Sequence, residues 1–498
     1  MADQTSRSRP TRRRRLATAA DLARRLDQKP GTVSDGVGLG DEGEPAPPQA
    51  PAFLGKLPPI GTPYTPQQPA TQALKALIQA KGYTSAFEAA VTRVSGQHVP
   101  ELDRIETLDQ FYFYVDALVT WIPEIRVWGM DGDEFHERTP YLRITQFYYY
   151  FNQPELRDLQ SPIEPAGDEG LSPISLWLRD FAVAWGAFLD TPASAGFLES
   201  FKWAPEYAWQ DFAKQPQDYA TFNDFFGRTF RDIDQLRPVA AADDDRVIAF
   251  PAESTFVGQW AISTPVGAPL FSPPSIVVKH VEWPIEELLK DTQHAEAFQG
   301  GILCHSFLNT FDYHRQHAPV AGRVLEAKLI VGQAYLKVTL DLLDKDQQQT
   351  TDPALARAVF PHRYLDAQDE TGYQFLQCRG LLVIESAVGK VAVLPMGMAQ
   401  VSSVVFVTPQ ADGQAPIVLT PAEREGRSFL EQTNLLNDRI RGALVGKVLK
   451  KGEMFSFFQF GGSDIVTVFE RRANVNITAA VGVHYPVRSQ FAVSNINR

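Results

Sequence analysis

The sequence near the C-terminus reads Lys451-Gly-Glu-Met-Phe-Ser-Phe-Phe-Gln-Phe-Gly-Gly-Ser-Asp-Ile-Val-Thr-Val-Phe-Glu470. A Gly-Gly-Ser-Asp sequence separates two runs, Phe455–Phe460 and Ile465–Phe469, that are rich in aromatic and β-branched residues. Such runs are typical of β-strands, and a glycine pair between them is typical of a tight turn. The stretch therefore predicts a hairpin with Ser463 in its turn, and a function for Ser463 has to be argued from residues elsewhere.

The composition is that of a globular enzyme in a reducing compartment, which we expect to be the cytoplasm. The chain has 498 residues, 44% of them hydrophobic, and a net charge of -12, which argues against broad nucleic-acid binding. Its only cysteines, Cys304 and Cys378, form no C-x-x-C pair, so neither a disulfide framework nor a thiolate metal site is predicted. No run of about 18 apolar residues occurs, so any membrane contact is expected to be peripheral.

Residues 1–70 are predicted to be a disordered basic tail followed by a linker. The tail, up to residue 27, includes the run Arg12–Arg15. It suits a solvated tail, or alternatively a segment attracted to an anionic surface. Residues 29–70 are rich in proline and glycine and have few apolar side chains with which to pack.

The rest of the chain predicts an α+β fold with two domains. In residues 71–220 aromatic side chains recur at helical spacing, as in Trp177, Phe181, Trp185 and Phe188, which indicates a largely helical domain with these side chains in its core. In residues 221–498 short runs rich in valine, isoleucine and phenylalanine alternate with glycine and proline, which predicts a mainly β catalytic domain.

The densest polar cluster is Asp312-Tyr-His-Arg-Gln-His317. On a helix, His314 and His317 would share a face and could bind a metal, but no third ligand is apparent nearby and no metal site is predicted. On a loop they could act separately as acid, base or proton donor near neutral pH. They could also be two buried structural histidines.

A carboxylate completes a set of residue types suited to acyl chemistry. Glu253, in Pro251-Ala-Glu-Ser254, could orient an imidazole such as His317, which could in turn deprotonate a hydroxyl such as Ser463. The chain has no G-x-S-x-G elbow and no G-x-x-x-x-G-K-[ST] loop, so neither an α/β-hydrolase triad nor a phosphate-binding loop is supported.

Six short segments, taken in their order along the chain, resemble those of a known family. They are Phe222-Asn-Asp-Phe-Phe-Gly-Arg228, Arg237-Pro238, Pro251-Ala-Glu-Ser254, Asp312-Tyr-His-Arg-Gln-His-Ala-Pro-Val-Ala-Gly322, Val401-Ser-Ser403 and Phe460-Gly-Gly-Ser463. In this order they resemble the phosphatidylserine decarboxylase family of pyruvoyl-dependent decarboxylases. The preceding helical region, with Trp185-Gly-Ala-Phe-Leu-Asp-Thr191, is similar to the domain found in a branch that includes fungal tryptophan decarboxylases.

The resemblance implies a cofactor made from the chain itself. Ser463 would attack the carbonyl of Gly462, and cleavage between them would leave a pyruvoyl group at residue 463. His317 would be the base for this step and Glu253 would orient it. The pyruvoyl group would condense with a substrate amine and accept electrons as CO2 leaves, while His314 would protonate the resulting carbanion. The cleaved C-terminal fragment, 463–498, would remain a partner of the longer chain.

Three functions stay open on the sequence. The helical domain and the acidic balance favour decarboxylation of a free L-amino acid, aromatic for example, such as tryptophan. The alternative substrate is phosphatidylserine, converted to phosphatidylethanolamine at a membrane surface. The third is an uncleaved pseudoenzyme with a binding role, because the family usually has Asp-Gly where this chain has Glu253-Ser254. Association into a homo-oligomer is left open.

Overall fold

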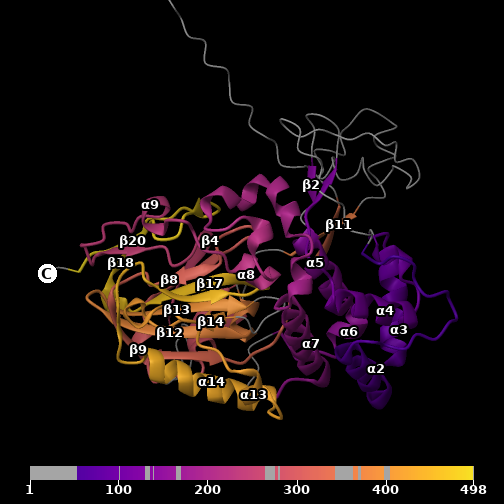
Figure 1. Ribbon diagram of the computed structural model, residues 1–498. Coiled ribbons are helices and arrows are strands. Elements are labelled where there is room, and N and C mark those ends of the chain that lie inside the picture. The colour runs from indigo at the N-terminus through magenta and orange to yellow at the C-terminus, as the bar shows by residue number, and fades with distance from the viewer. Residues whose placement is uncertain are drawn as a thin grey trace, which may run out of the picture.

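The computed structural model describes residues 53–99, 101–128, 135–137, 139–163, 170–263, 275–278, 281–342, 363–367, 372–397 and 404–496. The predicted basic tail and Val401-Ser-Ser403 lie outside these residues. Within them a helical part precedes a sheet-rich part, as the sequence predicts, and the two pack side by side (Figure 1). No described helix is long and apolar enough to cross a bilayer.

The helical part is built from amphipathic helices with short 3-10 turns after them. The α-helices are α2 Pro69–Lys81, α3 Thr84–Ser95, α4 Leu108–Val119, α5 Thr139–Phe151, α6 Pro154–Arg157, α7 Pro173–Leu189, α8 Phe222–Phe226 and α9 Ile233–Leu236. The 3-10 turns between α7 and α8 are Pro192–Ala195, Leu198–Trp203, Pro205–Tyr207, Trp209–Asp211 and Pro216–Asp218. Helix α7 begins after Ser172, whose hydroxyl accepts a hydrogen bond from the backbone N–H of Ser175 at 3.2 Å.

The aromatic stripe of α7 forms the core of this part, as predicted. Phe181 and Trp185 are fully buried, and the Phe181 ring stacks on Phe147 of α5 with 4.4 Å between centroids. The sequence predicts a linker up to residue 70, whereas residues 53–68 pack on the helices. Leu54 is buried, and the Tyr64 hydroxyl donates to Asp116 of α4 at 2.8 Å.

The sheet-rich part is organised by one antiparallel sheet of eight strands. Its strands, in spatial order, are β15 Val448–Leu449, β9 Gly322–Ile330, β12 Arg379–Ser386, β13 Gly389–Gly397, β17 Gly462–Phe469, β7 Ile302–Phe307, β4 Ser254–Ala261 and β19 His484–Tyr485. Helix α14, Phe429–Leu444, follows the short α13, Pro421–Arg424, and lies against β9, where Asn437 bonds the backbone N–H and C=O of Leu329.

Smaller sheets surround the large one. One joins β14 Val404–Phe406, β16 Met454–Phe458 and β8 Arg315–His317, and another joins β18 Val475–Ile477, β20 Gln490–Ser494 and β3 Val247–Ala249. Two-stranded pairs are β1 Arg126–Trp128 with β2 Phe135–Glu137, β10 Thr339–Leu342 with β11 Arg363–Asp366, and β5 Ser275–Val278 with β6 Val281–Pro284. Helix α10, Ile285–Leu289, follows β6.

The predicted hairpin around Ser463 is wrong. Strand β16 pairs with β14 and β8, whereas β17 pairs with β13 and β7, so the two strands belong to different sheets. The change of direction falls at Gly461, whose φ of +109° is in the region that favours glycine, and Gly462 already begins β17. Local residue pattern identified both strands, but it does not specify their partners.

Replacing Phe181 by alanine tests the aromatic core. Because the ring is fully buried against Phe147, we expect the free energy of unfolding to fall by about 3 to 5 kcal/mol in urea titrations. The matched control is Leu176→Ala on the same helix, where the side chain is 38% exposed and the loss should stay below about 1 kcal/mol. Equal losses for the two variants would contradict the described packing.

Candidate active site

The Gly462–Ser463 bond lies at the start of the central strand β17. Gly462 is in register with Gly397 at the end of β13, and Asp464 is in register with Met396, with an irregularity of the pairing between them. On the other side, Asp464 is in register with Phe307 of β7. The backbone on either side of the predicted cleavage site is therefore fixed by the sheet.

His317 is buried in β8 with both ring nitrogens engaged. Nδ1 lies 2.8 Å from the carbonyl oxygen of Gly452, and Nε2 lies 3.1 Å from the hydroxyl of Tyr313. Because a carbonyl only accepts, Nδ1 carries the proton, so Nε2 has the lone pair and accepts from Tyr313. Burial, with the charge of Arg488 second, lowers the pKa of His317 to about 3. The ring is thus a neutral base whose orientation Gly452 sets.

Position 452, whose carbonyl orients the His317 ring, requires glycine. Its φ of +78° is unfavourable for side chains, and a Cβ would come within 2.5 Å of the Val239 side chain. The same carbonyl also accepts from Arg488 Nε at 2.9 Å. The orienting group for His317 is therefore a backbone carbonyl in the stretch that leads into β16.

The Glu253 carboxylate pairs with Arg237 and not, as expected, with His317. Both carboxylate oxygens of Glu253 accept hydrogen bonds from Arg237, at 2.8 Å from Nε and 2.7 Å from a terminal nitrogen. A bidentate arginine satisfies a carboxylate more fully than one imidazole N–H can. Glu253 nevertheless lies close enough for its charge to contribute to the raised pKa of Tyr313, which results mainly from burial.

His314 is buried outside the hydrogen-bond network of His317. Because Arg315–His317 is a strand, the two histidines do not share a helix face. The His314 ring stacks on Phe226 of α8 with 3.7 Å between centroids, and neither ring nitrogen has a hydrogen bond of good geometry among the described residues. Burial, together with the charge of Arg228, lowers its pKa well below the ordinary value.

The preceding aspartate links the histidine motif to the C-terminal segment. Asp312 Oδ1 lies 2.9 Å from His484 Nε2, and Oδ2 accepts from the backbone N–H of Asn309 at 2.7 Å. The pair raises the pKa of His484, chiefly through this hydrogen bond. Asp312 therefore contacts a residue on the far side of the predicted cleavage site.

Sequence reasoning missed a polar network between the helical part and the cleavage segment. Asn223 of α8 accepts from the backbone N–H of Phe460 at 3.1 Å and donates to Asp190 at 2.9 Å. Asp190, which follows α7, also accepts from Gln459 Nε2 at 3.0 Å. The rings of Phe222 and Trp185 pack edge-on against Phe460. The resemblance motifs contain Asp190, Asn223 and Phe460, but only the fold brings them together.

Sequence reasoning also missed a buried pair formed by His305 and Asp464, the residue that follows Ser463 in β17. His305 Nε2 of β7 is 2.8 Å from Asp464 Oδ1, and both side chains are buried. Asp464 Oδ2 has no hydrogen-bond partner among the described residues. The signal in the sequence was the aspartate directly after Ser463. Within the described part of the chain no group of three or more His, Cys, Asp or Glu side chains could hold a metal ion.

Comparison with known proteins agrees with the motif order. A family model described as Phosphatidylserine decarboxylase matches residues 222–491, more than half of the chain. Phosphatidylserine decarboxylase proenzyme 3 of Schizosaccharomyces pombe is 25% identical over 294 residues, which cover 59% of this chain and 23% of that protein. The chain thus spans under a quarter of that relative.

Two other relatives differ in their named substrates. The phosphatidylserine decarboxylase proenzyme of Fusobacterium nucleatum is 24% identical over 294 residues, covering 59% of this chain and 74% of that protein. The L-tryptophan decarboxylase of Psilocybe cyanescens is 25% identical over 191 residues, covering 37% of this chain and 39% of that protein. These identities do not favour a lipid over an amino acid as the substrate of this chain.

The burial of neutral His314 and His317 predicts a loss of stability in mild acid. Unfolded histidines bind protons below pH 6.5, whereas these two stay neutral when folded, so the unfolded state gains protons as the pH falls. Between pH 7.5 and 5.5 each should therefore lower the free energy of unfolding. His484 acts in the opposite direction, because its folded pKa is raised.

Urea titrations at the two pH values measure this loss. His317→Gln should reduce the difference in unfolding free energy between them, because it removes one of the two buried imidazoles. An undiminished pH dependence in His317→Gln would contradict a buried neutral imidazole.

Proposed function

The chain belongs to the phosphatidylserine decarboxylase family, and we propose that it is a self-processing decarboxylase of a free L-amino acid. One observation carries the proposal: the family match spans both the histidine motif and the Gly462–Ser463 bond, which lies in the central strand of the sheet. Its two cysteines are free and buried, which suits a reducing cytoplasm.

Self-processing requires a hydroxyl, a carbonyl and a base. The Ser463 hydroxyl adds to the Gly462 carbonyl, and transfer of the bond from nitrogen to oxygen converts the amide to an ester. Elimination then leaves a carboxylate on Gly462, and hydrolysis at residue 463 releases ammonia and leaves a pyruvoyl group. His317 Nε2 is the base, and its lone pair has to exchange Tyr313 for the reacting hydroxyl.

Two features of the sheet support this processing. Gly462 is in register with Gly397, so neither residue of this pair adds a side chain at this end of the sheet. The short chain stays in place after cleavage, because residues 464–469 are hydrogen-bonded to β13 and β7. Once formed, the pyruvoyl group supplies a carbonyl that accepts electrons as CO2 leaves.

The remaining roles are assigned to residues of the family motifs. His314 delivers a proton to the carbon that loses CO2, and the negative charge of a substrate carboxylate favours its protonated form. Glu253 acts on the site through Arg237, whose guanidinium it holds in place. No metal enters this scheme.

The substrate is proposed to be a free amino acid, aromatic for example, because the helical part packs directly on the segment that leads to Ser463. Phosphatidylserine is the second candidate, since relatives are named for it. The predicted basic tail would then bring the enzyme to an anionic bilayer.

The mass of the purified protein tests self-processing. We expect two fragments, one that ends at Gly462 and one that begins at residue 463. The Ser463→Ala variant should remain one chain of 55.4 kDa. Release of CO2 should follow cleavage and occur with free amino acids rather than with phosphatidylserine in vesicles. A parent protein that remains one chain would instead support an uncleaved pseudoenzyme, and activity on vesicles alone would support the lipid enzyme.

The polar network around Phe460 should affect the rate of cleavage. In Asn223→Ala the cleavage segment loses a backbone hydrogen bond and its link to Asp190, so we expect cleavage to slow by about tenfold to a hundredfold. The control is Asp224→Ala, an exposed neighbour on α8. Cleavage is followed on gels over time after synthesis, with unfolding measured in parallel. Equal cleavage rates in both variants would remove Asn223 from processing.

A further inference from the structure

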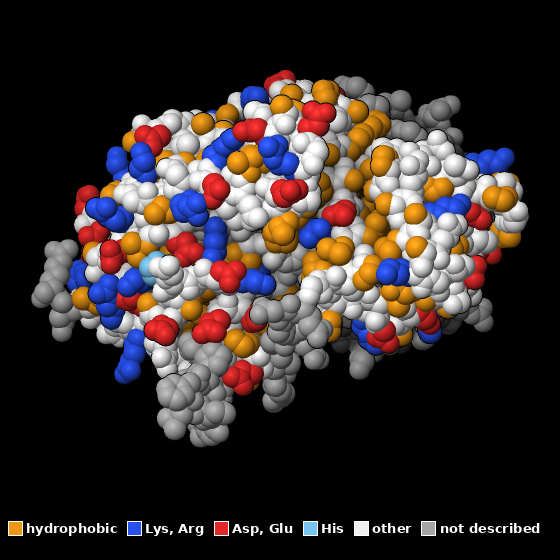
Figure 2. All heavy atoms as spheres, turned by 90° about the horizontal axis from the view of Figure 1, so that it is seen from below, with side chains coloured by type: hydrophobic (Ala, Val, Ile, Leu, Met, Phe, Trp, Pro, Cys, Tyr) orange, Lys and Arg blue, Asp and Glu red, His pale blue; other side chains and the backbone are white. Residues whose placement is uncertain are grey.

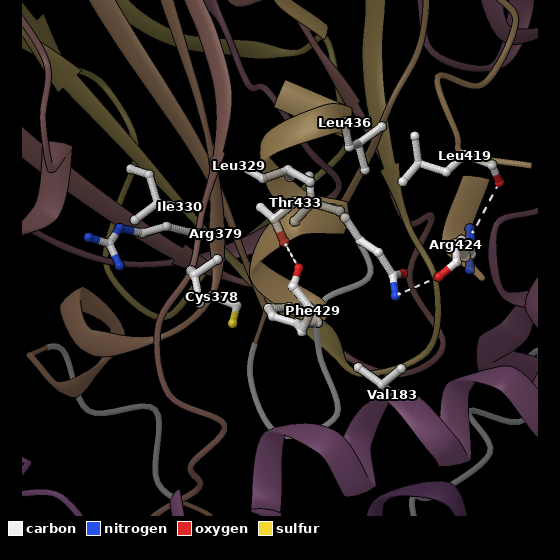
Figure 3. Close-up of a pocket in the computed structure, with 13 residues that line it drawn as sticks. Val183, Leu329, Ile330, Cys378, Arg379, Leu419, Arg424, Phe429, Thr433 and Leu436 are labelled. Atoms are coloured by element: carbon white, nitrogen blue, oxygen red, sulfur yellow. Dashed lines mark hydrogen bonds between the residues drawn. The ribbon is translucent and has the colours of Figure 1, made fainter. Parts of the chain in front are cut away.

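We propose that a cavity between α7, α14 and the sheet receives the side chain of the amino acid substrate, and that it selects a neutral, apolar side chain. This inference rests on the proposed function and adds the residues that determine specificity. The cavity is lined by side chains from β9, β12, α13, α14 and α7, and has a volume of about 140 Å³. Figure 3 shows Val183 of α7 on one side of it and Phe429 of α14 on another.

The register of the sheet places the cavity beside the cleavage site. Cys378, which lines it, is joined to β13 by the hydrogen bond from the Gly397 N–H to the Cys378 carbonyl at 2.9 Å. Gly397 is in turn in register with Gly462. Two strand spacings separate Cys378 from Gly462, a distance of about 10 Å. Because the intervening Gly397 has no side chain, a substrate bonded at residue 463 can extend across it toward Cys378.

The walls of the cavity are suited to an apolar group. Leu329, Ile330, Phe429 and Leu436 supply hydrocarbon surface. The polar side chains of α14 that line it bond to nearby backbone: Thr433 donates to the Phe429 carbonyl at 2.9 Å, and Gln432 donates to the Arg427 carbonyl at 2.8 Å. These two polar side chains are therefore engaged with the backbone, and the rest of this wall offers hydrocarbon to a ligand.

The size and charge of the cavity narrow the substrate further. A cavity of about 150 Å³ in another protein accommodates benzene, so this volume matches one aromatic ring or a branched aliphatic chain. No carboxylate is among the described residues that line it, and Arg424 is one of them, so a cationic side chain would find a like charge and no described partner of opposite charge. The Arg379 guanidinium points away and donates to the backbone carbonyls of Leu288 and Gln377 (Figure 3).

The helical part completes the cavity. Val183 lies on α7 and is 40% exposed, and the Arg179 guanidinium of the same helix lies 4.4 Å from the centre of the Phe429 ring. Seen from below, hydrophobic side chains gather in the hollow between the two parts of the molecule (Figure 2). Specificity therefore depends on a residue of the helical part that lies outside the matched family segment.

The test places a larger side chain on α7 so that the cavity becomes smaller. Val183→Phe should leave self-cleavage unchanged but lower kcat/KM for phenylalanine by about tenfold or more. The matched control Leu176→Phe, on the same helix and 38% exposed, should not change kcat/KM. The parent enzyme should prefer phenylalanine and leucine to lysine and glutamate by at least about tenfold. A cleaved, active enzyme that prefers charged side chains, or a Val183→Phe variant with unchanged kcat/KM, would overturn the inference.

Binding to the uncleaved chain separates this inference from the proposed function. Ser463→Ala should bind 2-phenylethylamine in ligand-observed NMR, and adding Val183→Phe should weaken that binding about tenfold, unlike Leu176→Phe. If this holds while the parent chain is never cleaved, the cavity is a ligand site and the decarboxylase proposal fails. Absence of binding in a parent enzyme that does cleave would overturn the cavity assignment alone.

Discussion

The hydrogen bonding of β17 between β13 and β7 is the constraint on which the site depends. It holds Gly462 opposite Gly397 and Asp464 between Met396 and Phe307, so the bond proposed to be cut starts from a fixed geometry. A strand bonded on both sides would keep its position if the chain were cut at its first residue. The proposed cleavage is thereby compatible with an intact sheet.

Burial determines what His314 and His317 can do. A buried imidazole is neutral because the surroundings disfavour its charge, and the carbonyl of Gly452 then decides which nitrogen of His317 bears the proton. A backbone carbonyl does this without adding a second buried charge. Glu253 pairs instead with Arg237, so each of these two largely buried charges has a partner of opposite sign.

The sequence predicted the two parts of the fold, because helical and strand periodicities are local properties of the chain. It identified His314, His317 and Glu253 through motifs. The structure joins two of these motifs by a hydrogen bond from the backbone N–H of His317 to the Pro251 carbonyl at 2.7 Å, but it pairs the Glu253 carboxylate with Arg237 and not with His317. Strand partners were not predictable in the same way, which is why the hairpin at Ser463 was wrong. Residues 53–68 pack through a few side chains such as Leu54, too few to stand out in the composition.

Helix α7 contacts both the segment before Gly462 and the cavity. Its end holds that segment, through Trp185 against Phe460 and through Asp190, which follows the helix, bonded to Gln459. Earlier in the same helix, Val183 lines the cavity. The backbone hydrogen bonds of a helix fix the distance between these two positions. The helical part therefore contributes both to the position of Phe460 and to one wall of the cavity. A substitution confined to the exposed side chain of Val183 is expected to change the cavity while the contacts of Trp185 and Asp190 stay in place.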